Sequence, residues 1–447
     1  MFLKNKFVTI FLFCFFASNA YSIELIRDVE LEEFTKEIML PLTRSSNLDD
    51  NRIDFYFINS NEVNAFVTAG QSIFINTELI IQSKTYAEYL GVLAHELAHI
   101  NAGHISRTKN QITELSEKSM PIYLLGILGI LGGEADAGIA AMMIGSASVQ
   151  DGYLYYSRTQ EAAADQLAIS LLCKANQPSW GLESFLKILE RETSQNSRDY
   201  QYKTTHPQTS DRYNWIKTSY KKYPNCQNGL DLKLERKFQN IRAKLTAFTH
   251  NQNEVFALYQ NEEDEFAKYA IAAANFFGGN QEKSINLLQS LIEMYPTNPY
   301  YHEFLGEIYY FQGDYTKALK KQKTAMSILS KDSDLHLMIL GTYLLAESSN
   351  KSIVESIKVL NKSLFLNRYN SYSWYLLAKA YALSDNLPLA QYASAERYYL
   401  NGDKPLALEF AKKAIKNIDK NTVEWYRTND LIELILGIDE KDNKNRS

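Results

Sequence analysis

A repeated pattern of small and aromatic residues in the second half of the chain constrains the fold more than any other feature. The clearest copy has a Leu-Gly pair, an aromatic residue three positions later, a turn glycine, and two alanines seven positions apart, namely Leu305, Gly306, Tyr309, Gly313, Ala318 and Ala325. Small residues at these offsets let two helices approach closely, and the aromatic residues fill the space between pairs. Such pairs bury their apolar faces only by stacking, so the pattern predicts a solenoid.

Further copies extend the pattern over residues 251–437. They are Trp374, Leu377, Ala378, Tyr381 and Ala390; Leu340-Gly341 with Ser356 and Ser363 after a three-residue insertion; and, more loosely, 269–296 and Tyr398, Gly402, Ala407 and Ala414. This spacing is typical of tetratricopeptide repeats, and we expect roughly four of them with a concave surface. They also account for much of the excess of tyrosine, of which the chain has 30. An irregular helical bundle is the alternative.

The first residues predict export. Lys4 and Lys6 precede an apolar run over 7–16, and small residues follow at 18–20, as in a cleaved signal peptide covering 1–22. Cys14 lies inside the run, where lipidation is not expected, so the product should be soluble. The net charge of −5 and the sequence pI near 5.9 argue against nucleic-acid binding.

The chemistry is carried by the sequence His95-Glu96-Leu97-Ala98-His99. Residues four apart on a helix lie about 40° apart around its axis, so both imidazoles can meet one metal ion. Zinc suits this donor set, with one ion per chain, and Glu96 is placed to act as general base in peptide hydrolysis. Two histidines on a polar helix face are the alternative.

A third ligand is needed, and a later helix offers it. One known pattern places a histidine ten residues after the first, but that position is Ile105. His104, on a helix predicted to run from Thr85 to about residue 106, falls opposite His95 and is interpreted as structural. Glu161 and Asp165 instead share a helix face: Glu161 would bind metal, and Asp165 would hold a histidine N–H. An acidic face paired with Arg158 is the alternative.

These motifs together resemble a known family. His95-Glu96-x-x-His99 joined to Ser157-Arg158-x-x-Glu161-x-x-Ala164-Asp165 is similar to zinc peptidases related to the CAAX-prenyl protease. The resemblance implies that His206, in Thr205-His206-Pro207, acts in catalysis, either stabilising the oxyanion or filling the fourth metal position in a latent state. It further implies that Arg212 orients substrate or acidic partners.

The resemblance also bears on the predicted strands 52–59, 64–68 and 72–76. It implies that Ser72-Ile73-Phe74-Ile75-Asn76 is an edge strand that pairs with extended substrate. Very apolar residues at 121–148 predict a buried helical hairpin, or otherwise a surface that touches a membrane or partner. Cys173 and Cys226 could close one disulfide after export; a buried thiol and a separate surface thiol are the alternative.

The expected protein is mainly α: a zincin-like α+β peptidase domain with a small β-sheet over 23–250, a tetratricopeptide solenoid over 251–437, and a polar tail over 438–447. The architecture predicts that the solenoid recruits protein clients or an assembly machine. The resemblance implies a periplasmic location and a zinc endopeptidase that degrades misassembled outer-membrane proteins. A chaperone with a silent or latent peptidase site, and a structural metal protein, are the rival hypotheses.

Overall fold

A computed structural model of the protein describes residues 25–46, 48, 53–68, 71–104, 158–195, 206, 210–223, 226, 228–259 and 264–437. The predicted signal peptide, the apolar segment 121–148 and the polar tail lie outside these residues. Within them, no helix combines the length and the hydropathy needed to cross a lipid bilayer.

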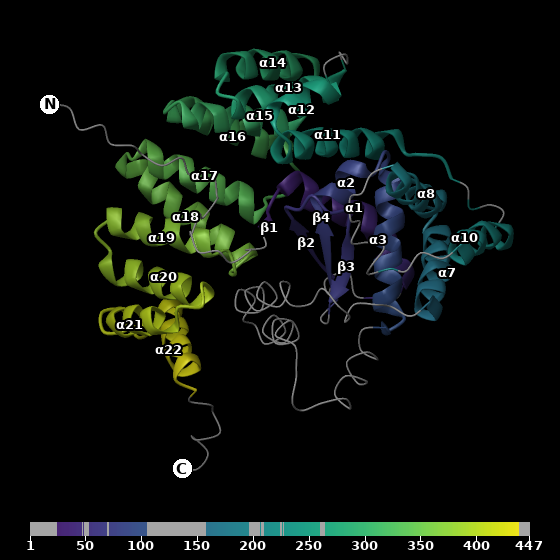
Figure 1. The fold of residues 1–447 in the computed structure, drawn as a ribbon. Coiled ribbons are helices and arrows are strands. Elements are labelled where there is room, and N and C mark those ends of the chain that lie inside the picture. Colours follow the sequence, from purple (N-terminus) through teal and green to yellow (C-terminus); the bar gives the residue numbers. More distant parts are fainter. Residues whose placement is uncertain are drawn as a thin grey trace, which may run out of the picture.

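The N-terminal part contains a small sheet that lies beside α3 (Tyr86–Asn101) (Figure 1). Its strands are β1 (Leu25–Ile26), β2 (Asp54–Ile58), β3 (Ala65–Thr68) and β4 (Ser72–Asn76), in the order β1-β2-β4-β3. β4 runs parallel to β2 and antiparallel to β3, with Thr68 opposite Ser72. All five β4 residues are buried.

The predicted strand positions are therefore confirmed, but the assignment of 72–76 as the edge strand is wrong. Both sides of β4 already pair with neighbouring strands, so its backbone groups are not available to a substrate. Among the described strands, the edge on this side of the sheet is β3.

The helix that carries the His-Glu motif is α3 (Tyr86–Asn101). Thr85 caps it and accepts a hydrogen bond from the Glu88 backbone, while Glu88 reaches back to the cap, as the sequence predicts. The helix ends at Asn101, earlier than expected, because Gly103 takes a left-handed φ of 65° and turns the chain away.

Two glycines let α3 pack backbone to backbone against α8 (Trp180–Gln195). A Cβ atom at Gly91 would lie 2.3 Å from the Leu182 nitrogen, and one at Gly181 would lie 1.8 Å from the Ala87 oxygen. No larger side chain fits at either position without moving a helix. α7 (Arg158–Lys174) packs against α3 as well, and α10 (Ser210–Lys222) lies on α7.

The C-terminal part consists of helical pairs that stack in order along an arc (Figure 1). Its described helices are α12 (Gln252–Tyr259), α13 (Glu265–Phe277), α14 (Gln281–Met294), α15 (Pro299–Phe311), α16 (Tyr315–Ile328), α17 (Asp334–Glu347), α18 (Asn350–Leu366), α19 (Ser371–Leu383), α20 (Leu387–Leu400), α21 (Lys404–Ala414) and α22 (Val423–Leu436). A Cβ at Gly306 would approach the Ala318 oxygen to 3.3 Å, and the turn residue Gly313 has a φ of 79°. The prediction of stacked pairs with small contact residues is confirmed.

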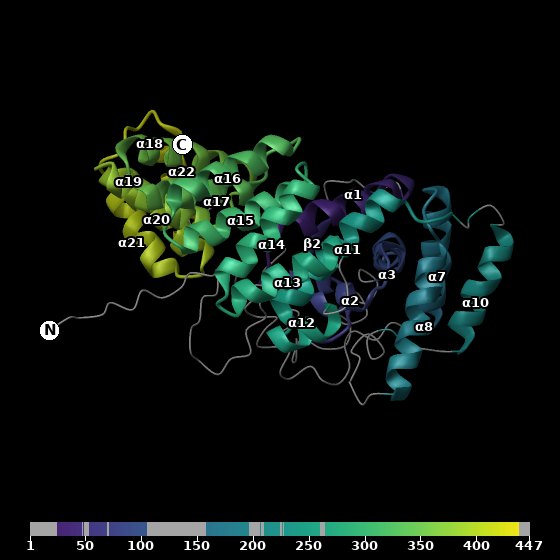
Figure 2. The same cartoon turned by 90° about the horizontal axis from the view of Figure 1, so that it is seen from above.

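One helix, α11 (Leu232–Thr249), belongs to both parts. Phe238 and Leu245 enter the core that holds the sheet and α3, whereas Ala243 and Ala247 enter the core of the first repeat helices. Figure 2 shows α11 between the repeat helices and the group of α3, α7 and α8. The two parts are thus joined along a shared helix.

The start of α1 (Val29–Ser46) is tied to the repeats as well. Arg27 pairs with Asp334 of α17 at 3.2 Å, and Val29 enters the core formed by α17 to α20. Lys244 of α11 binds Asp28 at 2.8 Å and Glu30 at 2.7 Å. These contacts fix the N-terminal segment between α11 and α17.

The carboxyl group of Glu307 on α15 lies near this charged junction and supports a prediction about pH. Burial, reinforced by the charge of Glu303, raises the pKa of Glu307 from 4.5 to about 8. The folded state therefore binds this proton more tightly than the unfolded chain does, and its contribution to stability is lost as pH rises from 4.5 through 8.

We expect Glu307→Gln, which cannot ionise, to gain stability relative to the unmodified protein as pH rises from 5 to 8.5. The difference in Tm between the two proteins measures this gain, and Glu293→Gln on the exposed side of α14 is the control. A Tm difference that stays constant with pH would contradict the assignment.

Candidate metal centre

Four buried side chains from three segments converge on one point. His95 and His99 come from α3, Glu161 from α7, and His206 from the chain before α10; one donor atom of each lies within 4.8 Å of all the others. All four side chains are fully buried. The structure thus brings together the three ligands expected from the motifs and the histidine suggested by resemblance.

The distances between donor atoms are short. Nε2 of His95 lies 3.1 Å from Nε2 of His99 and 3.4 Å from a Glu161 oxygen. Nδ1 of His206 lies 3.0 Å from the other Glu161 oxygen and 3.3 Å from Nε2 of His95. Three imidazole nitrogens and one carboxylate suit a divalent transition metal, and burying them together without one would leave polar groups poorly satisfied.

Glu96 lies beside this cluster without being part of it. Its carboxylate is fully buried and, within the described residues, accepts no hydrogen bond; Nε2 of His206 is 3.4 Å away. Burial raises the pKa of Glu96 above its ordinary value. A carboxylate that is buried, unengaged and easily protonated suits proton transfer.

Glu161 has the opposite electrostatics. Burial alone would raise its pKa, but the charges of His206 and His95 outweigh burial and lower the pKa well below the ordinary value. Glu161 therefore stays ionised, as a metal ligand must. The pKa values of the two carboxylates in this site are thus shifted in opposite directions.

Asp165 and Arg212 hold the donor residues in place. Oδ1 of Asp165 lies 2.9 Å from Nδ1 of His95, as predicted for a carboxylate that orients a ligand histidine. Arg212 donates two hydrogen bonds of 2.8 Å to Asp165 and lies 2.7 Å from Glu161. Arg212 therefore contacts acidic partners; the side chain of Arg158 lies outside the described residues.

His104 lies closer to the cluster than the sequence predicts, although it is not among the four converging donor residues. Its Nδ1 lies 3.0 Å from Nδ1 of His99, and its side chain is buried. The interpretation extended α3 past residue 104 and so placed His104 on the far face. The turn at Gly103 instead brings His104 back onto His99.

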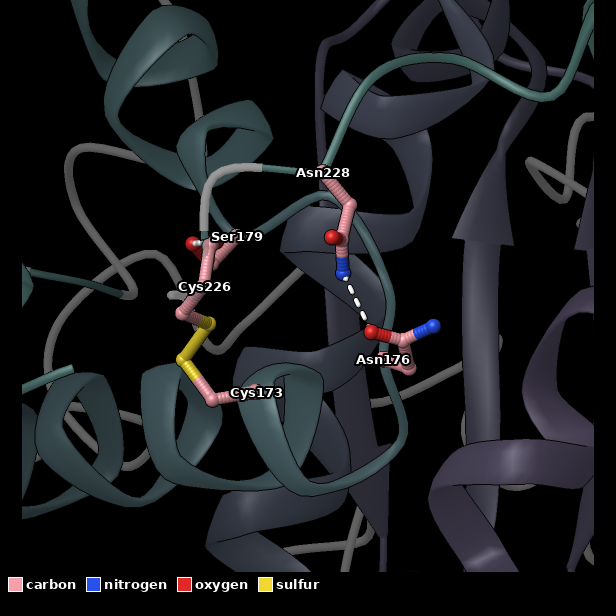
Figure 3. Close-up of a disulfide and its surroundings, with 5 residues drawn as sticks. All are labelled: Cys173, Asn176, Ser179, Cys226 and Asn228. Atoms are coloured by element: carbon pink, nitrogen blue, oxygen red, sulfur yellow. Dashed lines mark hydrogen bonds between the residues drawn. A yellow bond between two sulfur atoms is a disulfide. The ribbon is translucent and has the colours of Figure 1, made fainter. Parts of the chain in front are cut away.

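A disulfide joins Cys173 to Cys226, with their Cα atoms 5.1 Å apart (Figure 3). Ser179 donates a 2.6 Å hydrogen bond to the Cys226 carbonyl, and Asn228 donates one of 2.9 Å to Asn176. Cys173 lies near the end of α7 and Cys226 just beyond α10. The disulfide thus ties the helix that carries Glu161 to the chain that leaves the helix carrying Arg212.

Comparison with known proteins agrees with this site. Residues 27–219 match the sequence profile of Peptidase family M48, and this range includes all four residues of the cluster, which supports a metalloendopeptidase. The β-barrel assembly-enhancing protease of Escherichia coli K12 is 23% identical over 431 residues, which cover 94% of this chain and 86% of that protein.

Two further relatives have similar descriptions. The β-barrel assembly-enhancing protease of Yersinia pestis is 23% identical over 95% of this chain and 87% of its own length. A putative β-barrel assembly-enhancing protease from Vibrio cholerae is 25% identical over 64% of this chain and 60% of its own length. Among solved structures, yeast Tom70 aligns with 81% of this chain and 82% of its own at 12% identity and a TM-score of 0.31.

The disulfide leads to a measurable prediction. Joining residues 53 positions apart restricts the unfolded chain, so replacing both cysteines by serine should lower the free energy of unfolding by about 2–4 kcal/mol. Denaturant unfolding measures the change, and the unmodified protein with reductant is the control. Unreduced folded protein should show no free thiol at these positions; two reactive thiols would refute the bond.

Proposed function

We propose that this protein is an exported, periplasmic zinc endopeptidase that degrades misassembled outer-membrane proteins and assists their assembly. The buried cluster of His95, His99, Glu161 and His206 beside Glu96 is the observation that carries the peptidase assignment. The client class comes from the relatives, whose names describe enhancement of β-barrel assembly. The repeat helices supply a surface for recruiting clients or an assembly machine.

In this proposal His95, His99 and Glu161 would hold a zinc ion, which would supply Lewis-acid chemistry for polarising a scissile carbonyl and activating water. Glu96 accepts the proton of the attacking water and passes it to the leaving amine. Its raised pKa suits both directions of transfer. Asp165 and Arg212 keep His95 and Glu161 oriented.

His206 gives specific support to a latent form of the enzyme. Its Nδ1 lies among the donor atoms, so it fills a position that a catalytic zinc site keeps open for water and substrate. This placement favours the second candidate function, a chaperone or assembly factor whose peptidase is silent until His206 moves away.

The general-base role leads to the main test of the proposal. Glu96→Gln should keep one zinc per chain and lower hydrolysis of an unfolded protein by about 10²–10⁴-fold or more, because the amide cannot accept the proton. Metal content and proteolysis are measured side by side. Retained proteolysis would remove Glu96 from this role, and retained cellular function would favour the chaperone alternative.

His206 leads to a separate prediction, in which the substitution raises hydrolysis instead of lowering it. His206→Ala should raise hydrolysis of the same substrate while zinc stays bound by the other three ligands, because the fourth position is then open. Glu161→Ala is the matched control and should lose zinc. A fall in hydrolysis by His206→Ala would mean that His206 stabilises the transition state instead.

His104 is proposed to orient His99 as Asp165 orients His95. An acceptor at Nδ1 of His99 keeps Nε2 free for the metal, and loss of such a partner typically lowers metal affinity by about 10–100-fold. His104→Ala should therefore weaken zinc binding in competition with a chelator. His104→Asn should restore part of the affinity, whereas unchanged affinity in both variants would leave His104 with a packing role only.

A further inference from the structure

In one repeat helix, α20, a charged residue stands at a contact position where other repeat helices bury a small residue or, as with Leu291 seven positions after Ser284 in α14, an apolar one. In α16, α18 and α21 the residue seven positions after the first small residue is again small, namely Ala325, Ser363 and Ala414, and each is fully buried. In α20 the residue seven positions after Ala390 is Arg397. A long charged side chain at a position where these other repeat helices bury an uncharged one points to a function.

Arg397 borders a hollow of about 300 Å³ between α19, α20 and α21. Apolar and aromatic groups make up most of its lining, including Tyr375, Ala378, Leu387 and Phe410. For comparison, an apolar cavity of about 150 Å³ admits benzene. The hollow is therefore large enough for one aromatic or branched apolar side chain of a ligand.

The charge of the hollow is positive. Lys379 and Arg397 lie in its lining, which contains no Asp or Glu, although acids outnumber bases in the whole chain. The Arg397 guanidinium stands 4.8 Å from the ring centre of Tyr375 and 5.6 Å from that of Tyr398. Within residues 264–437, neither cation forms an ion pair with a carboxylate.

The Arg397 guanidinium lies over aromatic rings rather than against a carboxylate, and a guanidinium can bind a carboxylate with two parallel hydrogen bonds. We propose that this hollow binds the C-terminal residue of a client polypeptide. The terminal carboxylate contacts Arg397, with Lys379 nearby, and the last apolar side chain enters the hollow.

Arg397 borders the apolar hollow itself, and this short distance between the cation and the hollow favours a chain terminus over an internal acidic segment as the ligand. Arg397 and Ala390 lie on one helix two turns apart, and both border the same hollow. A C-terminal residue carries its carboxylate and its side chain on one Cα atom, so both reach their partners without further ordering of the ligand. The inference rests on the proposed recruiting role of the repeats and specifies what they recognise.

The test measures fluorescence anisotropy of labelled ten-residue peptides on the full mature chain carrying Glu96→Gln, which prevents cleavage. One peptide ends in phenylalanine with a free carboxylate, a second is the same peptide as an amide, and a third is an amide with an internal Glu-Phe pair. The free-carboxylate peptide should bind about tenfold or more tightly than either amide, as for a charged hydrogen bond.

Arg397→Ala should abolish the preference for the free carboxylate. This variant is expected to fold, because alanine stands at the corresponding position of two other repeats, and a thermal melt checks it. Lys358→Ala on the exposed face of α18 changes the charge equally and should leave binding unchanged. Ala382→Trp, which fills the hollow, should weaken binding of all three peptides.

Equal binding of the acid and amide peptides, or unchanged binding by Arg397→Ala, would overturn the proposal. Equal binding of the internal Glu-Phe peptide would overturn the choice of a C-terminus. Peptide binding needs neither zinc nor Glu96, whereas the proposed peptidase function is tested by hydrolysis of unfolded protein. The peptide-binding proposal can therefore fail while the peptidase proposal is supported, and the reverse also holds.

Discussion

The contact of Arg212 with Asp165 and Glu161 is the interaction on which the rest of the candidate site depends. Two buried carboxylates about one helical turn apart repel each other and are costly to desolvate. One guanidinium reaches both, at 2.8 and 2.7 Å, and so allows both to stay ionised in the core. With Asp165 and Glu161 fixed, His95 has a partner on each of its ring nitrogens.

This arrangement makes α7 and α10 a single unit opposite the rigid helix α3. α3 and α8 pack closely, because their backbones meet at Gly91 and Gly181. α10 in turn reaches the remainder of the protein mainly through α7 and α8, and the disulfide fixes its far end. His95, His99 and Glu161 thus lie on helices that are held by these packing contacts and by the disulfide.

Much of this site could be predicted from the sequence, because helical spacing converts positions into shared faces. That logic places His95 with His99, and Glu161 with Asp165, and it fails for His104, where Gly103 ends the helical geometry. The strand 72–76 was located correctly but assigned the wrong place in the sheet, because a sequence pattern gives no order of pairing. The contact between Arg212 and both acids depends on the tertiary packing of α10 on α7, which no local pattern encodes.

The double role of α11 limits how such a protein can change over evolution. One side of this helix completes the peptidase core and another begins the repeat core, with Phe238 and Ala247 as examples. A gene fusion that replaced the repeats with a different array would have to supply a partner for that second side, or leave it in water. The two parts are therefore expected to be inherited together, and new client preferences to arise by substitution within the repeats.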